Sequence, residues 1–77
     1  MTFENFIEKF AEQFEEAEPG MFAADTEFKQ LEEWSSLMAL SLIAMVDEEY
    51  DVTLKGDDIK NSKTIEDLFK IVSSKAK

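Results

Sequence analysis

An amphipathic helix near the start of the chain constrains the fold more than any other feature of the sequence. Large apolar residues recur there at the i, i+3, i+4 spacing that places side chains on one face of a helix: Phe3, Phe6, Ile7, Phe10 and Phe14. The glutamates of this segment point away from that face, namely Glu4, Glu8, Glu12 and Glu15. Thr2 is suitably placed to cap the N-terminus of this helix, and we expect Pro19-Gly20 to end it.

The segment from Pro19 to Ser35 lacks helical periodicity, yet it is too apolar to be a free linker. A connection of this length in a compact domain is usually packed down or functional. We expect it to be held against the core by five side chains, namely Met21, Phe22, Phe28, Leu31 and Trp34.

A second helix is predicted from Ser36 to about Asp51. At 100° per residue, one stripe of this helix should face the core, made of Ala39, Leu42, Ile43, Val46 and Tyr50. The other side is unusually apolar for a surface and carries Leu37, Met38, Ser41, Ala44, Met45 and Glu48.

The remainder of the chain predicts two more helices. Residues 57–61 can form one short turn, and Thr64 with Asp67 resembles a capping box at the start of the last helix. The apolar stripe of that helix is Ile65, Leu68, Phe69 and Val72. We therefore expect residues 1–77 to form a single all-α domain. It should be a small four-helix bundle of three longer helices and one short helix, with a long first loop.

Composition argues against a self-sufficient enzyme. The 77 residues include no cysteine and no histidine, which removes the thiol nucleophile, the commonest general base and the commonest metal ligand. Seven phenylalanines in a sequence that is 44% apolar are sufficient for one compact core. The acidic segment "DEEYDVTLKGDD" lacks the alternating spacing of a calcium loop, so a metal-binding role is disfavoured.

The formal charge of −10 is unevenly distributed. Residues 1–51 contain 14 acids and 2 lysines, whereas residues 52–77 contain 4 acids and 6 lysines, and no arginine occurs. Such a surface repels nucleic acid and anionic lipid, and it favours partners with basic patches. No window approaches the roughly 20 apolar residues of a membrane span, and no secretory leader is evident. We expect a soluble, cytoplasmic protein.

Taken together, these features resemble the acyl carrier protein family. The family pattern is an amphipathic first helix, a long loop with a Phe and a Leu, a "D-S-L" motif, an apolar helix that ends in acids and an aromatic residue, a short third helix, and a "T-[IV]-x-[DE]-L" start to the last helix. This chain offers Phe28 and Leu31, "SSL" at 35–37, "VDEEYDV" at 46–52 and "TIEDLFKIV" at 64–72. The match spans nearly the whole chain in order and spacing.

The resemblance implies that Ser36 carries a covalent 4′-phosphopantetheine arm, derived from coenzyme A and attached by a phosphopantetheinyl transferase. A chain without cysteine must import the sulfur of a thioester on a cofactor, and a helix N-terminus favours the anionic phosphodiester. The implied function is to carry an acyl or aminoacyl intermediate as a thioester to partner enzymes, with the carrier acting as a monomer. Fatty acid biosynthesis, polyketide synthesis and peptide assembly all use such carriers. The alternative is a carrier-fold structural subunit without the arm.

The resemblance also suggests which residues partners recognise. Ser35 stands where the family usually has the aspartate that helps dock the transferase, and Ser35 is then free to cap the second helix. Asp47 and Glu48 match the usual contacts for basic patches. The residues Leu37, Met38, Ser41 and Met45 depart from the usual acidic face, which suggests apolar docking and a specialised lipid or secondary-metabolite pathway. Alternatively, the helix is rotated so that the methionines complete the core. Trp34 is either a lid over the arm or an anchor for the loop.

Overall fold

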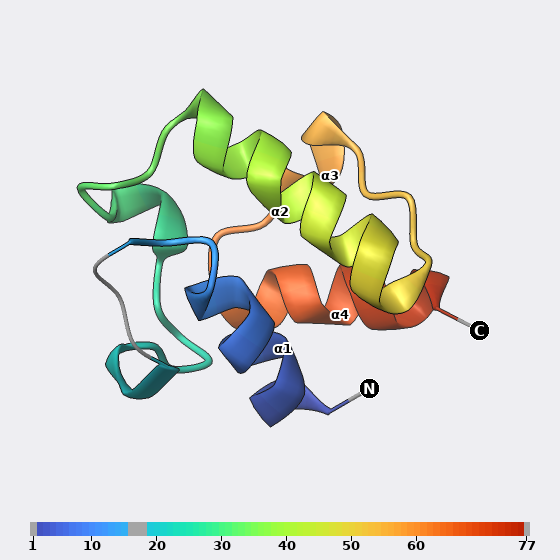
Figure 1. Ribbon diagram of the computed structural model, residues 1–77, viewed down its shortest axis with the longest axis horizontal. Helices are drawn as coiled ribbons and strands as arrows, with labels where there is room; N and C mark the ends of the chain where they lie inside the picture. Colours follow the sequence, from blue (N-terminus) through green and yellow to red (C-terminus); the bar gives the residue numbers. More distant parts are fainter. Residues whose placement is uncertain (1, 16–18, 77) are drawn as a thin grey trace.

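The computed structural model describes residues 2–15 and 19–76, and over these residues every regular element is helical (Figure 1). The order is α1 (Phe3–Ala11), the 3-10 turns η1 (Pro19–Met21) and η2 (Phe28–Gln30), α2 (Ser36–Tyr50), α3 (Gly56–Lys60) and α4 (Ile65–Lys75). The expected all-α bundle of three longer helices and one short helix is confirmed. In Figure 1, α2 crosses above α4, while the long first loop lies at one side and leads to the start of α2.

Helix α1 begins as predicted but ends early. The Thr2 hydroxyl accepts a hydrogen bond from the Asn5 backbone N–H at 3.1 Å, so the predicted N-cap is confirmed. The prediction that the helix continues to Pro19-Gly20 is wrong, because α1 ends at Ala11. The Phe14 side chain is buried, with its ring centroid 5.6 Å from that of Phe22. The packing of Phe14 against the loop, rather than helical periodicity, therefore determines the path of the backbone beyond Ala11. Residues 16–18 of the predicted helix lie outside the described residues.

The long connection is held to the core by aromatic packing, as expected. Phe28 is fully buried, and its ring lies edge-on to Phe10 and Trp34 at centroid distances of 5.7 and 5.0 Å. Phe22, Leu31 and Trp34 are partly buried against the same core. Met21 was also expected to hold the loop, but its side chain is 65% exposed, so that expectation is wrong.

Hydrogen bonds attach the same connection to the last two helices. The carbonyls of Ala24 and Thr26 accept from the N–H groups of Glu66 and Ile65, both at 3.0 Å. Those N–H groups belong to the first turn of α4, where no acceptor within the helix is available. Lys29 Nζ donates to the carbonyl of Lys60 at 2.9 Å, at the end of α3. The loop therefore completes the hydrogen bonding of two helix ends.

The core-facing side of α2 is wider than the sequence suggested. Leu42 and Val46 are fully buried, as predicted, but Met45 is also buried at 5% exposure. The interpretation that Met45 lies on an exposed docking face is therefore wrong. The physical reason is that α2 packs against both α1 and α3, so its flanks are covered as well as its central stripe.

The last helix begins with the predicted capping box. The Thr64 hydroxyl accepts from the Asp67 N–H at 3.2 Å, and an Asp67 carboxylate oxygen accepts from the Thr64 N–H at 3.1 Å. At the other end of α4, Lys75 Nζ donates to the Asp58 carboxylate at 2.6 Å. This pair ties the end of α4 to the first turn of α3, because Asp58 is the third residue of that short helix.

Candidate functional site

The site begins with a serine that ends an extended segment and starts α2. Ser35 has φ −158° and ψ 175°, and its hydroxyl accepts from the Met38 backbone N–H at 3.3 Å. Its carbonyl accepts from the Ala39 N–H at 3.1 Å. Ser35 is therefore the N-cap of α2, and its side-chain oxygen is already engaged in holding the helix start.

Ser36 is the first residue inside α2, and its side chain is exposed. Among the described residues, its hydroxyl has no hydrogen-bond partner, in contrast to that of Ser35. The first turn contains no acidic residue, so nothing there opposes the positive potential of the helix N-terminus. An exposed hydroxyl beside unpaired backbone N–H groups suits the attachment of an anionic group.

The residues that lead to Ser36 are fixed against the core. Trp34 lies half-buried against Phe28, and its backbone N–H donates to the Leu31 carbonyl at 3.0 Å. A carboxylate oxygen of Glu33 accepts from the Glu15 backbone N–H at 3.3 Å. These contacts favour the anchor interpretation of Trp34 and hold Ser36 at the end of a packed loop.

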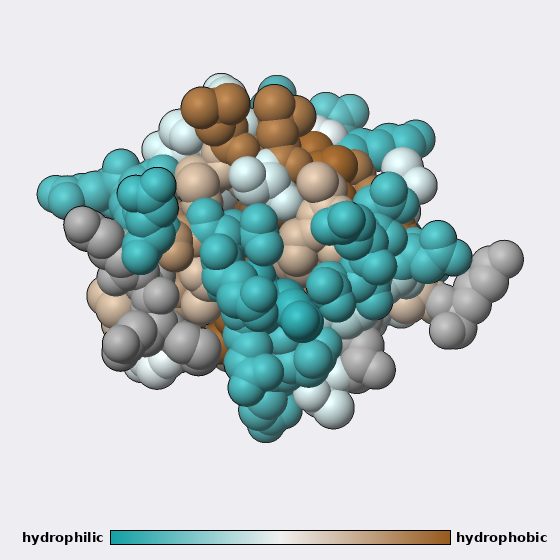
Figure 2. Space-filling model, viewed as in Figure 1, coloured by the Kyte–Doolittle hydropathy of each residue, from teal (hydrophilic) through white to brown (hydrophobic). Residues whose placement is uncertain are grey.

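An apolar strip lies on the outer surface of α2 next to Ser36. Leu37 is 74% exposed and Leu40 is 61% exposed, and Figure 2 shows a hydrophobic patch at the upper edge of the molecule, where Figure 1 draws the N-terminal part of α2. Met38 and Ser41 are partly buried, and Met38 packs against the core. Sequence reasoning did not single out Leu40, although residues 37, 40 and 44 fall within a narrow stripe at 100° per residue.

Acidic residues gather at the opposite end of α2. Asp47 and Glu48 are exposed, and neither forms an ion pair with a described residue, whereas Glu49 pairs with Lys9 at 3.7 Å. The C-terminus of a helix is its negative pole, so each exposed acid there costs about 0.3–1 kcal/mol at low ionic strength. Asp51 caps this end in the left-handed conformation, with φ 54° and ψ 43°. The exposed acids and the left-handed conformation of Asp51 therefore both reduce the stability of the C-terminal end of α2.

Residues 2–15 and 19–76 form neither a metal centre nor a membrane span. Within these ranges, no three acids lie close enough together to hold a metal ion. No helix in the described part of the chain has the length and apolar character needed to cross a bilayer.

A bundle of three longer helices and one short helix, with an exposed serine at the start of the second long helix, has the architecture of a carrier domain. The family model described as "Phosphopantetheine attachment site" matches residues 5–72, so the chain belongs to this family. No curated protein and no solved structure matches the chain significantly.

Family membership confirms the resemblance to carrier proteins and fixes the general chemistry. Carrier domains of this family bear a covalently attached 4′-phosphopantetheine group, and they are acted on by partner enzymes rather than being catalytic. They work with a phosphopantetheinyl transferase and with acyl-handling enzymes. The exposed hydroxyl of Ser36 and its position in the first turn of α2 are compatible with such a group.

Proposed function

We propose that the Ser36 hydroxyl carries the 4′-phosphopantetheine arm and that the chain, acting as a monomer, presents acyl or aminoacyl intermediates to partner enzymes. The observation that carries this proposal is the contrast between two neighbouring serines. Ser35 uses its hydroxyl to cap α2, whereas the Ser36 hydroxyl is exposed and has no partner among the described residues.

The residues of the chain supply position and charge stabilisation. The N-terminus of α2 stabilises the phosphodiester by about 0.3–1 kcal/mol when the group is exposed. The arm itself supplies the thiol that forms the thioester, which the protein lacks because it has no cysteine. The packing of Trp34 on Phe28 keeps the attachment point at a fixed place on the bundle.

We further propose that partners recognise the outer face of α2. Leu37 provides an exposed apolar contact beside the arm, Met38 and Ser41 flank it, and Asp47 and Glu48 attract basic side chains. Because Met45 is buried, it packs beneath this face and does not contact a partner directly. Exposed leucines in place of acids support a specialised lipid or secondary-metabolite pathway, with partners whose docking surfaces combine an apolar centre with basic groups.

The modification is tested by intact mass measurement after incubation with coenzyme A and a promiscuous phosphopantetheinyl transferase. The parent protein and Ser35→Gly should both gain the mass of the arm, because glycine at an N-cap costs only a few tenths of a kcal/mol. Ser36→Ala should gain nothing. Failure of the parent to be modified by several transferases, or modification of Ser36→Ala, would refute the assignment.

A further variant probes the departure from the family pattern at position 35. Ser35→Asp keeps an N-cap and adds the acid that the family usually has there. We expect it to be modified faster than the parent if the transferase uses a basic docking patch. An equal rate would mean that the serine has no effect on transferase recognition.

A structural subunit without the arm is the second candidate, and the missing acid at position 35 and the exposed Leu37 and Leu40 favour it. Purification from the native source discriminates between the two functions. A carrier should be recovered with the arm attached, whereas a structural subunit should be entirely unmodified and bound to a stoichiometric partner.

A further inference from the structure

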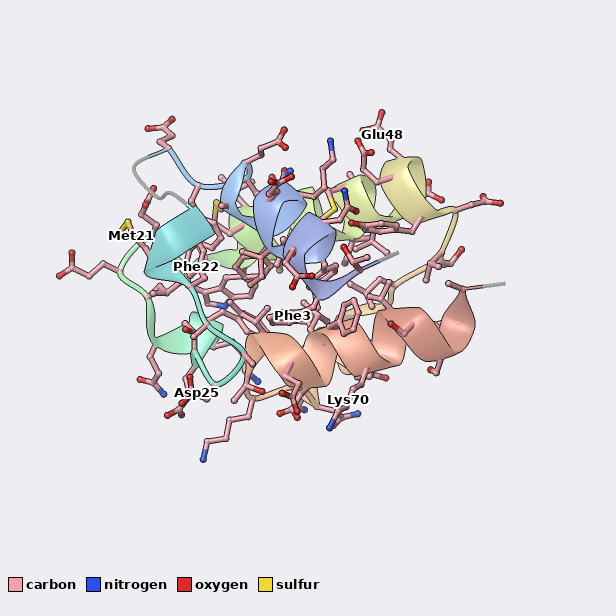
Figure 3. All side chains as sticks on the ribbon, turned by 90° about the horizontal axis from the view of Figure 1, so that it is seen from below. Phe3, Met21, Phe22, Asp25, Glu48 and Lys70 are labelled. Carbon is pink, nitrogen blue, oxygen red and sulfur yellow. The ribbon has the colours of Figure 1, made fainter. Side chains whose placement is uncertain are left out.

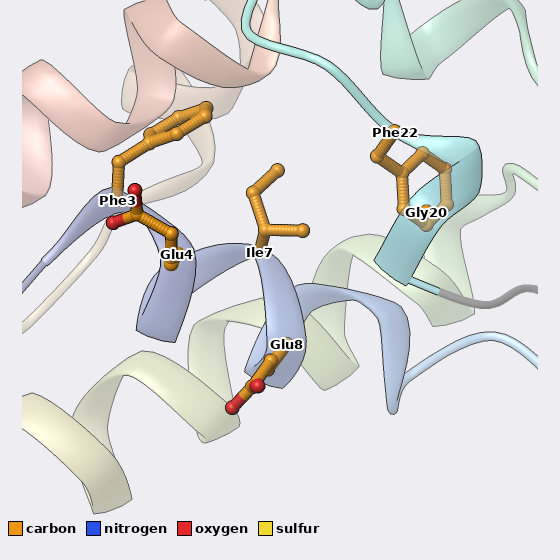
Figure 4. A pocket seen from close by; sticks show the side chains of 6 residues that line it. All are labelled: Phe3, Glu4, Ile7, Glu8, Gly20 and Phe22. Atoms are coloured by element: carbon orange, nitrogen blue, oxygen red, sulfur yellow. The ribbon is translucent and has the colours of Figure 1, made fainter.

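A hollow of about 360 Å³ lies between α1 and η1, on elements that do not carry Ser36 (Figure 4). Its volume is at the low end of the roughly 300–1,000 Å³ typical of ligand pockets. The described residues that line it are Phe3, Glu4, Ile7, Glu8, Gly20 and Phe22. In Figure 4, Phe3 and Ile7 extend from α1 and Phe22 lies across from them beside η1, and Figure 3 shows Phe3 between α1 and α4.

The apolar floor of the hollow is held in place by the core. The Phe22 ring packs against Phe10 and Phe14 at centroid distances of 5.4 and 5.6 Å. The Phe3 ring lies edge-on to Phe69 at 5.2 Å. Both lining rings are only partly buried, so one surface of each remains available beside the hollow. A floor that is already ordered loses little side-chain entropy when it receives an apolar group.

The rim of the hollow is negatively charged. Glu4 and Glu8 are exposed and lie one turn apart on α1, and neither pairs with a basic group among the described residues. Lys9, the nearest lysine in sequence, instead contacts Glu12 and Glu49, both at 3.7 Å. Like charges at i, i+4 destabilise a helix by about 0.2–0.5 kcal/mol, and a basic partner would relieve this repulsion.

We propose that this hollow is a second docking surface, which receives an apolar side chain from a basic amphipathic helix of a partner protein. The apolar side chain contacts Phe3, Ile7 and Phe22, while lysines or arginines of the partner helix approach Glu4 and Glu8. A second copy of this chain is a poor occupant, because each copy has a net charge of −10. Binding at this surface does not depend on modification of Ser36. A partner can therefore hold the carrier here while the face of α2 remains accessible to another enzyme.

Gly20 provides a variant that blocks the hollow without a clash. A Cβ atom built on Gly20 meets no heavy atom within 4 Å, and no described glycine has a positive φ. Gly20→Leu should therefore fold normally and fill the open space. Gly56 is a matched control, since a Cβ atom there also meets nothing within 4 Å and Gly56 belongs to α3.

The experiment uses full-length Ser36→Ala protein, so that failure of the proposed arm cannot affect the result. The probe is a synthetic amphipathic helical peptide with leucines on one face and lysines on the other. Binding is followed by the amide signals of the ¹⁵N-labelled protein. We expect the largest shifts at the residues that line the hollow, and an affinity about tenfold weaker for Gly20→Leu but unchanged for Gly56→Leu.

Two more comparisons separate docking from general attraction between opposite charges. Glu4→Gln with Glu8→Gln should weaken binding severalfold, whereas Glu32→Gln with Asp57→Asn removes the same charge elsewhere and should have little effect. A peptide with serines in place of its leucines should bind about tenfold more weakly. The proposal is overturned if this serine peptide binds as well as the leucine peptide, if Gly20→Leu has no effect, or if the shifts centre on the acids of α2.

Discussion

Replacing Phe28 by alanine should destabilise the protein by about 3–5 kcal/mol, the usual cost of removing a fully buried phenylalanine ring. Phe28 is completely buried and makes edge-on contacts with Phe10 and Trp34. Each such aromatic pair contributes about 0.5–1.5 kcal/mol beyond area burial. Because the ring joins the long connection to the core, its loss also frees the segment that leads to Ser36.

The cost of Phe28→Ala is large compared with the total free energy of unfolding of the domain. At about 0.05–0.15 kcal/mol per residue, a chain of 77 residues has about 4–12 kcal/mol of unfolding free energy. Phe28→Ala therefore leaves a marginal fold or none. Phe28→Leu retains much of the apolar volume and should cost about 1–2 kcal/mol, which keeps the prediction measurable.

Urea titration followed by circular dichroism measures the loss by linear extrapolation. Trp34 is the single tryptophan, and because it contacts Phe28 its fluorescence provides a second, local reading. Its emission should move to longer wavelength in folded Phe28→Leu. Gln30→Ala, an exposed change in the same 3-10 turn, serves as the control and should stay within about 0.5 kcal/mol of the parent. If Phe28→Ala costs less than about 1 kcal/mol, the aromatic anchor is not what holds the connection.

Three other substitutions test the helix ends. Asp51→Gly should stabilise the protein by about 1 kcal/mol, because glycine adopts φ 54° without strain. Thermal unfolding measures this gain, and unchanged stability would contradict the prediction. Tyr50→Phe should lower the free energy of unfolding by about 1 kcal/mol, since it removes the 2.5 Å hydrogen bond from the Tyr50 hydroxyl to Asn5 Oδ1. Urea unfolding measures this change, and an unchanged free energy would show that the bond does not stabilise the fold. Lys75→Met should cost about 1 kcal/mol at neutral pH. In the parent protein, the hydrogen bond from Lys75 lowers the pKa of the Asp58 carboxyl. The stabilisation from this pair is therefore present above the pKa of about 3.9 that the carboxyl has in the unfolded chain, and it is lost as pH falls through the lower pKa of the folded state. Unfolding curves for Lys75→Met and the parent should therefore converge in acid, and a constant difference would contradict the coupling.

Features that depend on neighbouring residues were predictable from the sequence. Thr2 and Thr64 cap their helices as expected, and Ser35 caps α2, because each cap is a local contact between a hydroxyl and an N–H three residues on. Family membership could be predicted for a similar reason, since the resemblance depends on short motifs at fixed spacing, such as "SSL" at 35–37 and "TIEDLFKIV" at 64–72, and the family model matches residues 5–72.

Features that depend on tertiary packing were not predictable in the same way. The end of α1 was misplaced because burial of Phe14 against the loop cannot be read from helical periodicity. Met45 was assigned to the wrong side because the angular width of the α2 contact depends on both α1 and α3. The hollow beside Gly20 also arises only when α1 and η1 come together, although Glu4 and Glu8 were correctly expected to point away from the core.

The central claim is that the arm is attached to the exposed hydroxyl of Ser36 rather than to the hydroxyl that caps α2. Fragment-ion mass spectrometry of the modified full-length protein tests it most directly, because cleavage between residues 35 and 36 separates the two serines. The account predicts that the added mass is found only in fragments that contain Ser36. Added mass in fragments that contain Ser35 and end before residue 36 would contradict it.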